Sequence, residues 1–108
     1  MKLLTNEQES RLRQNHALQD PERAIDFKPV VKLFGGSATW LLAELDDDNI
    51  LFGLCDLGFG FPELGYVSLN ELESYQGFPL IERDRHFVAT KTLSEYATEA
   101  WEHQMIRT

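Results

Sequence analysis

Two apolar segments separated by a short polar turn restrict the fold of this chain more than any other feature. The segments span residues 38–45 and 50–57, and the run Asp46-Asp47-Asp48-Asn49 lies between them. Extended apolar segments joined by turn-forming residues are typical of a β-hairpin. Apolar side chains occur at both odd and even positions, so both faces of the hairpin are apolar. The sequence therefore predicts a central hairpin that is covered on both faces, or covered on one face and used for contact on the other.

The pairing of the hairpin determines which side chains share a face. If Leu45 pairs with Ile50, Leu45 lies on the same face as Leu41 and Ala43, because side chains alternate along a strand. Trp40 then lies on the opposite face, where it packs in the core or contacts a partner.

Capping signals predict the helices. Thr5 with Gln8, Ser68 with Glu71 and Thr92 with Glu95 each have the spacing of a capping box. We expect helices over about 5–17, 68–75 and 92–105, with Trp101 in the core stripe of the last one. Strands are predicted at 29–34 and 80–88, and a glycine-punctuated loop over 58–65 is expected to tuck its aromatic residues Phe59 and Phe61 into the core.

These elements predict an α+β fold. It has a small, mostly antiparallel sheet of about four to five strands with a central hairpin, packed by an N-terminal, a short middle and a C-terminal helix. The 108 residues, 43% of them hydrophobic, are expected to form one domain over 1–108. The absence of a secretory signal or membrane-length apolar run predicts a cytoplasmic protein that does not enter a membrane. Cys55, the single cysteine, is expected to be a small buried side chain.

The charge of the chain is unevenly distributed. The net charge is −8, yet residues 1–32 and 83–108 are each close to neutral. Between Leu33 and Glu82 there is no Lys or Arg, and nine Asp and Glu side chains occur there. Nucleic-acid binding proteins neutralise phosphates with Lys and Arg, so direct DNA or RNA binding is disfavoured. Such a region would attract a basic protein surface or a divalent cation, or serve only to keep the protein soluble.

Several segments resemble a family of small bacterial proteins, domain of unknown function 2958. They are residues 29–34 (PVVKLF), 38–42 (ATWLL), 52–58 (FGLCDLG), 60–67 (GFPELGYV), 81–84 (IERD) and 86–87 (HF), and the similarity extends from about Leu3 to Ala97. The resemblance implies a bacterial origin and an association with DNA processing on mobile elements. It implies no established activity or catalytic residue.

A carboxylate and histidine cluster is the one catalytic arrangement that the residues indicate. Glu82, Asp84 and His86 alternate along the predicted strand at 80–88, and Asp56 and Glu63 flank the glycine loop. Together they could bind a divalent metal that activates water for phosphodiester cleavage, as in a nuclease-like hydrolase. The structural alternative is that the two acids on the strand pair with neighbouring basic residues, in which case no cofactor is bound.

The interaction hypothesis rests on other residues. Trp40 lies on the second apolar face of the hairpin, and the turn residues Asp46, Asp47 and Asp48 are acidic. A non-catalytic accessory module that contacts a basic protein partner is therefore the main functional prediction. A metal-dependent phosphodiesterase and an acidic mimic of nucleic acid are the alternatives. The oligomeric state is left open.

Overall fold

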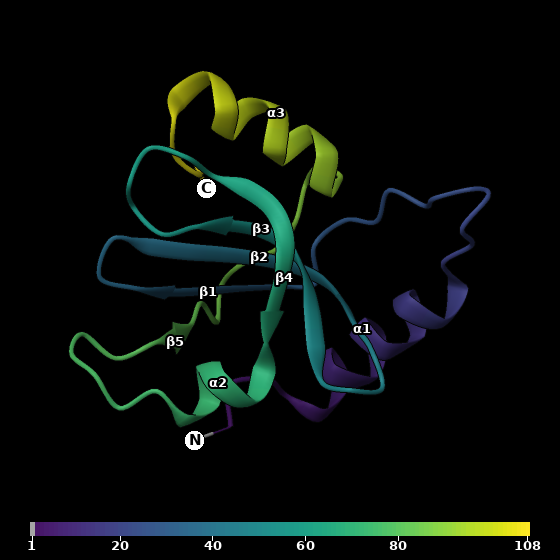
Figure 1. Cartoon of the computed structure of the whole chain (residues 1–108), viewed down its shortest axis with the longest axis horizontal. Helices are drawn as coiled ribbons and strands as arrows, with labels where there is room; N and C mark the ends of the chain where they lie inside the picture. Colours follow the sequence, from purple (N-terminus) through teal and green to yellow (C-terminus); the bar gives the residue numbers. More distant parts are fainter. Residues whose placement is uncertain (1) are drawn as a thin grey trace.

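The computed structural model describes residues 2–108 and confirms the α+β prediction. Within these residues a five-stranded antiparallel sheet in the order β4-β3-β2-β1-β5 is combined with three helices (Figure 1). The elements are α1 (Asn6–Leu18), β1 (Val31–Gly35), β2 (Ala38–Leu45), β3 (Ile50–Asp56), β4 (Glu63–Ser68), α2 (Leu69–Ser74), β5 (Glu82–Arg83) and α3 (Leu93–His103). The central hairpin is the pair β2–β3.

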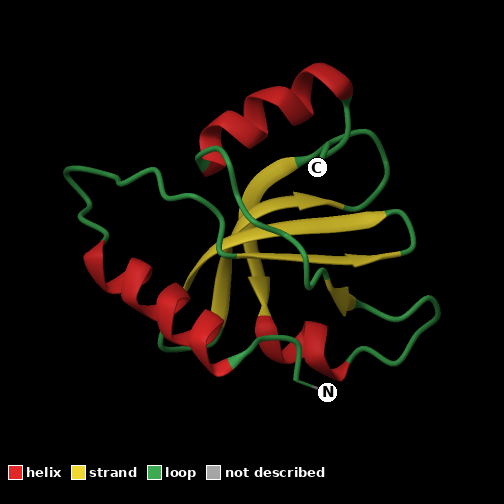
Figure 2. Ribbon diagram, turned by 180° about the vertical axis from the view of Figure 1, so that it is seen from behind, coloured by secondary structure: helices red, strands yellow, loops and turns green. Residues whose placement is uncertain are grey.

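Helices cover both faces of the sheet, as the apolar character of the hairpin predicts. Figure 2 shows α3 on one side and α1 and α2 on the other. On the face we call the α2 face, Trp40, Leu42 and Leu51 pack in one cluster with side chains from the N-terminal segment, α1 and α2. On the α3 face, Leu41 and Leu54 pack against the apolar side of α3. The β2 strand separates the two clusters, and all its residues from Trp40 to Leu45 are buried.

A β-bulge changes the predicted pairing of the hairpin. Leu41 lies opposite Leu54, as predicted, but after Leu42 the register shifts by one residue and Leu45 lies opposite Leu51. The predicted pair of Leu45 with Ile50 is therefore wrong, and so is the predicted face of Leu45. An extra residue in one strand reverses the alternation beyond it. The bulge moves Leu45 into the α2-face cluster and turns Glu44 to the other face.

The predicted capping residues begin the three helices. The Thr5 side chain accepts a hydrogen bond from the Gln8 backbone N–H, and the Gln8 side chain accepts one from the Thr5 N–H, both at 3.0 Å. Ser68 accepts from the Glu71 N–H at 3.2 Å. The Thr92 N–H donates to the Glu95 carboxylate at 2.9 Å. None of the helices in residues 2–108 combines the length and apolar composition needed to cross a membrane.

The strand predicted at 80–88 is much shorter in the structure. Only Glu82 and Arg83 pair with β1, and a turn follows in which the Asp84 carboxylate accepts a hydrogen bond from the His86 N–H at 2.9 Å. Asp side chains often compete with strand pairing in this way. The predicted alternation of side chains therefore ends at Arg83.

Three aromatic residues predicted to lie in the core are exposed. Phe59 is 78% exposed and Phe61 is 77% exposed, so the glycine loop between β3 and β4 does not tuck them inward. Trp101 is 53% exposed, and its indole N–H donates to the Pro62 carbonyl at 2.8 Å. That hydrogen bond fastens the loop to α3, while the loop's two phenyl rings remain in solvent.

We expect Gly53→Ala to destabilise the protein strongly. A Cβ atom at Gly53 would lie 2.1 Å from the Leu41 carbonyl oxygen, so β2 and β3 would have to separate next to the bulge. The free energy of unfolding should fall by about 3 kcal/mol, measured by urea denaturation. Gly65→Ala is the matched control, because Gly65 pairs with Gly53 and a Cβ there meets no atom within 4 Å. Equal destabilisation by both substitutions would contradict the close approach.

Candidate functional site

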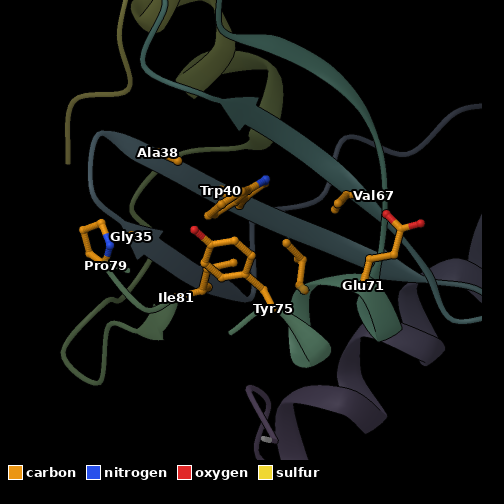
Figure 3. Close-up of a pocket in the computed structure, with 9 residues that line it drawn as sticks. Gly35, Ala38, Trp40, Val67, Glu71, Tyr75, Pro79 and Ile81 are labelled. Atoms are coloured by element: carbon orange, nitrogen blue, oxygen red, sulfur yellow. The ribbon is translucent and has the colours of Figure 1, made fainter. Parts of the chain in front are cut away.

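An apolar cleft opens on the α2 face beside the turn that joins β1 to β2. Its volume is about 380 Å³. Trp40 lies at its centre, with Tyr75, Pro79 and Ile81 on one side and Val67 and Glu71 on the other (Figure 3). We call it the Trp40 cleft. Pockets with mainly apolar walls and few polar groups are typical binding sites.

Trp40 is held by the strand beneath it. It lies in β2 between Leu33 of β1 and Cys55 of β3, and only 6% of its surface is exposed. Its indole N–H has no hydrogen-bond acceptor among residues 2–108. Every side-chain nitrogen that is fully buried in this part of the chain does have a partner, so the indole nitrogen is not fully buried. That N–H must therefore reach the solvent in the cleft. Figure 3 shows the indole nitrogen pointing toward the side of Val67 and Glu71.

The short helix α2 positions the polar rim of the cleft. Ser68 caps the helix through the Glu71 backbone N–H, which places the Glu71 carboxylate in the first turn, where the helix dipole favours a negative charge. Tyr75 follows the last turn. Its ring lies against Gly77, where a Cβ atom would be 2.2 Å from the hydroxyl oxygen, so a side chain at this position would displace the ring. The rim therefore presents a carboxylate and a phenol next to the buried indole.

Glu71, at the rim of the cleft, and Glu63, on the same face of the sheet, form no ion pair with the described residues. Among the described residues no Lys or Arg side chain lies within 4 Å of the Glu71 or Glu63 carboxylate. Glu63 lies opposite Cys55 on the neighbouring strand. Leu33, Trp40, Cys55 and Glu63 form one row across the sheet, so the second carboxylate lies on the same face as the cleft. Phe78, which precedes Pro79 of the cleft, is 94% exposed, and the exposed Phe61 lines a separate pocket with Cys55 and Glu63. Large exposed apolar patches with polar rims mark interaction sites.

Cys55 is a poor nucleophile in this setting. Burial raises the pKa of its thiol to about 11, and the negative charge of Glu63 adds to the rise. A thiolate is disfavoured where it would be desolvated beside another negative charge.

The structure does not bring the sequence-predicted metal ligands together. Asp56 ends β3, whereas Glu82 lies in β5, and β2 and β1 separate these strands. Three strand spacings amount to about 14 Å, whereas oxygen ligands share one ion at about 2.5 Å. Glu63, on β4, is one strand farther away. Nowhere in residues 2–108 do three His, Cys, Asp or Glu side chains lie close enough to hold a metal ion.

Two of the predicted metal ligands have structural partners. The buried carboxylate of Asp56 accepts hydrogen bonds from the N–H groups of Gly58 at 2.8 Å and Ile106 at 3.0 Å, which ties the C-terminal segment to the sheet. Asp84 lies 3.7 Å from the Lys32 ammonium. The side chains of Glu82 and His86 are exposed.

The acidic turn lies at the opposite end of β2 from Trp40. Trp40 and Asp46 are six positions apart in the chain, which corresponds to roughly 20 Å of strand. Asp46 accepts hydrogen bonds from the N–H groups of Asp48 and Ile50, and Arg13 donates to the Asp46 carbonyl at 2.8 Å. Of the three turn aspartates, Asp47 and Asp48 are exposed and Asp46 is half-buried. Trp40 and the three turn residues predicted for interaction therefore belong to two separate surfaces.

Sequence reasoning missed Glu71 and Tyr75 as site residues. The capping pattern from Ser68 to Glu71 identified the helix, but it did not show that this helix forms the wall of a cleft above Trp40. No pattern within the sequence connects residue 40 with residue 75.

Comparison with known proteins identifies a family. The family model described as "Protein of unknown function (DUF2958)" matches residues 3–107. Neither the curated proteins nor the solved structures provide a match to the chain.

Alkylation of Cys55 should be slow at neutral pH. With its pKa raised from 9.0 to about 11, the reactive thiolate at pH 8 is reduced about a hundredfold. Rates with iodoacetamide should keep rising with pH beyond 9 in the folded protein, and should level off near pH 9 to 10 in urea. A plateau near pH 9 in the folded protein would show that burial does not protect the thiol.

Magnesium, manganese and zinc should not raise the melting temperature. A metal stabilises a folded protein only where it binds the folded state, and the predicted ligands lie too far apart to share one ion. Thermal melting with each metal, compared with a chelator control, checks this. A stabilisation that grows with metal concentration and is lost in Asp84→Asn would restore the hydrolase hypothesis.

Proposed function

The chain belongs to the protein family of unknown function DUF2958, and from that premise we propose that it is a non-catalytic protein-interaction module whose Trp40 cleft receives a basic side chain of a partner protein. An exposed carboxylate without a cationic partner at the rim of an aromatic cleft carries the proposal. In line with the bacterial resemblance, we place the module in a bacterial cytoplasm, where DNA-processing proteins offer basic surfaces.

The chemistry of the cleft fits arginine or lysine. Their aliphatic stems pack on apolar surface while the charged end remains polar, and Val67, Leu72 and Ile81 supply such surface. A cation next to the Trp40 and Tyr75 rings gains cation–π attraction. Glu71 then accepts hydrogen bonds from the charged end.

The surrounding charge favours the same partner. Between Leu33 and Glu82 the chain contains no Lys or Arg, so an incoming basic segment meets no like charge from these residues. Glu63, on the same face, offers a second carboxylate for a neighbouring basic residue. Electrostatic complementarity of this kind speeds association and selects against acidic partners.

Peptide display is the direct test of the partner's chemistry. A random peptide library selected on the wild-type protein and counter-selected on the double variant Glu71→Gln with Tyr75→Ala should enrich peptides that contain arginine or lysine next to apolar residues. Both substitutions lie at exposed positions, so the variant should fold. Enrichment of acidic or uncharged peptides, or of none, would contradict the proposal.

Affinity measurements should then assign the contact to the cleft. In a Trp101→Phe background Trp40 is the only tryptophan, and its fluorescence should change when a selected peptide binds. Glu71→Gln should weaken binding about tenfold, because one charge-assisted hydrogen bond is lost. Glu102→Gln removes an exposed carboxylate from α3 on the other face and should leave the affinity unchanged. Equal weakening by both would indicate general charge attraction instead of a site.

A further inference from the structure

A second pocket lies on the α3 face, at the end of the sheet that α3 does not cover. Its volume is about 510 Å³. The connection after α1 lines one side, with Gln19 and Ile25, and the strands β2, β3 and β4 supply Glu44, Phe52 and Tyr66. No sequence pattern predicts this pocket, because the bulge in β2 is what turns Glu44 into it.

Glu44 is a buried carboxylate whose hydrogen bonding is incomplete. Only 9% of the residue is exposed. Its Oε2 atom accepts a hydrogen bond from the Gln19 side chain at 2.7 Å. Within the described chain the other oxygen, Oε1, has no donor at hydrogen-bond distance, and the His16 ring nitrogen is 3.8 Å away. A carboxylate can accept about four hydrogen bonds, so Oε1 is available to a ligand.

The orientation of the Gln19 amide shows that Glu44 acts as an acceptor. The Ile25 N–H donates to the Gln19 Oε1 at 2.9 Å, which identifies that atom as the oxygen. The Gln19 Nε2 must therefore donate, and it donates both to the Ile25 carbonyl at 2.8 Å and to Glu44. The Gln19 side chain thus bonds both the connection after α1, at Ile25, and the Glu44 carboxylate.

The walls of the pocket favour a cation with an apolar body. The rings of Phe52 and Tyr66 lie 5.1 Å apart in a tilted arrangement. The charged residues that line the pocket are Asp20, Glu44 and Asp46, whereas His16 is the one basic side chain among the lining residues. Aromatic faces beside a carboxylate form the usual receptor for an organic cation.

We propose that this pocket binds a small organic cation, whose ammonium or guanidinium group donates to Glu44 Oε1 while its apolar body contacts Phe52 and Tyr66. The site is separate from the Trp40 cleft, since it lies on the other face and at the other end of the sheet. Either site can therefore be present without the other.

Benzylamine tests the proposal, with benzyl alcohol as the neutral control of the same shape. In an NMR titration of the protein, benzylamine should bind at least tenfold more tightly than benzyl alcohol and should shift the resonances of Ile25, Phe52 and Tyr66. Glu44→Gln should weaken amine binding at least tenfold. Glu71→Gln, which alters only the Trp40 cleft, should leave amine binding unchanged.

Three results would overturn the proposal. They are equal affinity for the amine and the alcohol, amine binding that Glu44→Gln does not weaken, and no binding at about 10 mM amine, the concentration range in which fragments of this size bind. Should Glu44→Gln fail to fold, Tyr66→Ala decides, because the Tyr66 side chain is largely exposed and its loss leaves the core intact. Amine affinity that is unchanged in Tyr66→Ala would then reject the site.

Discussion

The close approach of β2 and β3 determines how the rest of the molecule is built. At Gly53 the two backbones come so near that a Cβ atom would lie 2.1 Å from the Leu41 carbonyl oxygen. The bulge follows directly, between Leu42 and Glu44, and reverses the alternation of β2. In a regular strand Glu44 would enter the α2-face core opposite Leu51, at a large desolvation cost. With the bulge, Leu45 occupies that core instead, and Glu44 reaches a pocket where Gln19 bonds it.

Local signals in the sequence were sufficient to predict the fold class. The features that they did not predict depend on contacts between residues that are distant in the sequence. Thr5, Ser68 and Thr92 begin their helices because a cap depends only on residues three positions away. The hairpin was predictable for the same reason, but its bulge was not, because the pattern of residues 41–45 fits either alternation. Trp101 matches a core stripe by spacing, yet its exposure depends on where the β3–β4 loop lies. The short β5 depends on the turn at Asp84.

The sequence shows how the charges are distributed along the chain, but it does not show which carboxylates are bonded within the fold and which are free to contact a partner. Among the acidic residues between Leu33 and Glu82, the carboxylates of Asp56 and Asp46 each accept hydrogen bonds from two backbone N–H groups. These bonds lie within the fold and leave less negative charge for a partner than the count of nine implies. Glu71, at the rim of the Trp40 cleft, and Glu63, two strands from Trp40 on the same face, are exposed. The acidic middle of the chain thus divides into carboxylates that hold the fold together and carboxylates that can meet a ligand.

The lengths of the elements explain why the Trp40 cleft and the Glu44 pocket lie diagonally across the sheet. The eight residues of β2 extend about 26 Å, whereas the six residues of α2 and the eleven of α3 rise only about 9 Å and 16 Å. Neither helix can cover its whole face. The β1–β2 turn marks the end of the sheet where the α2 face stays open over Trp40, and the α3 face is open at the other end, over Phe52 and Glu44. Each opening exposes an aromatic surface next to a carboxylate, so a central strand with two apolar faces and short covering helices produces both candidate cation sites.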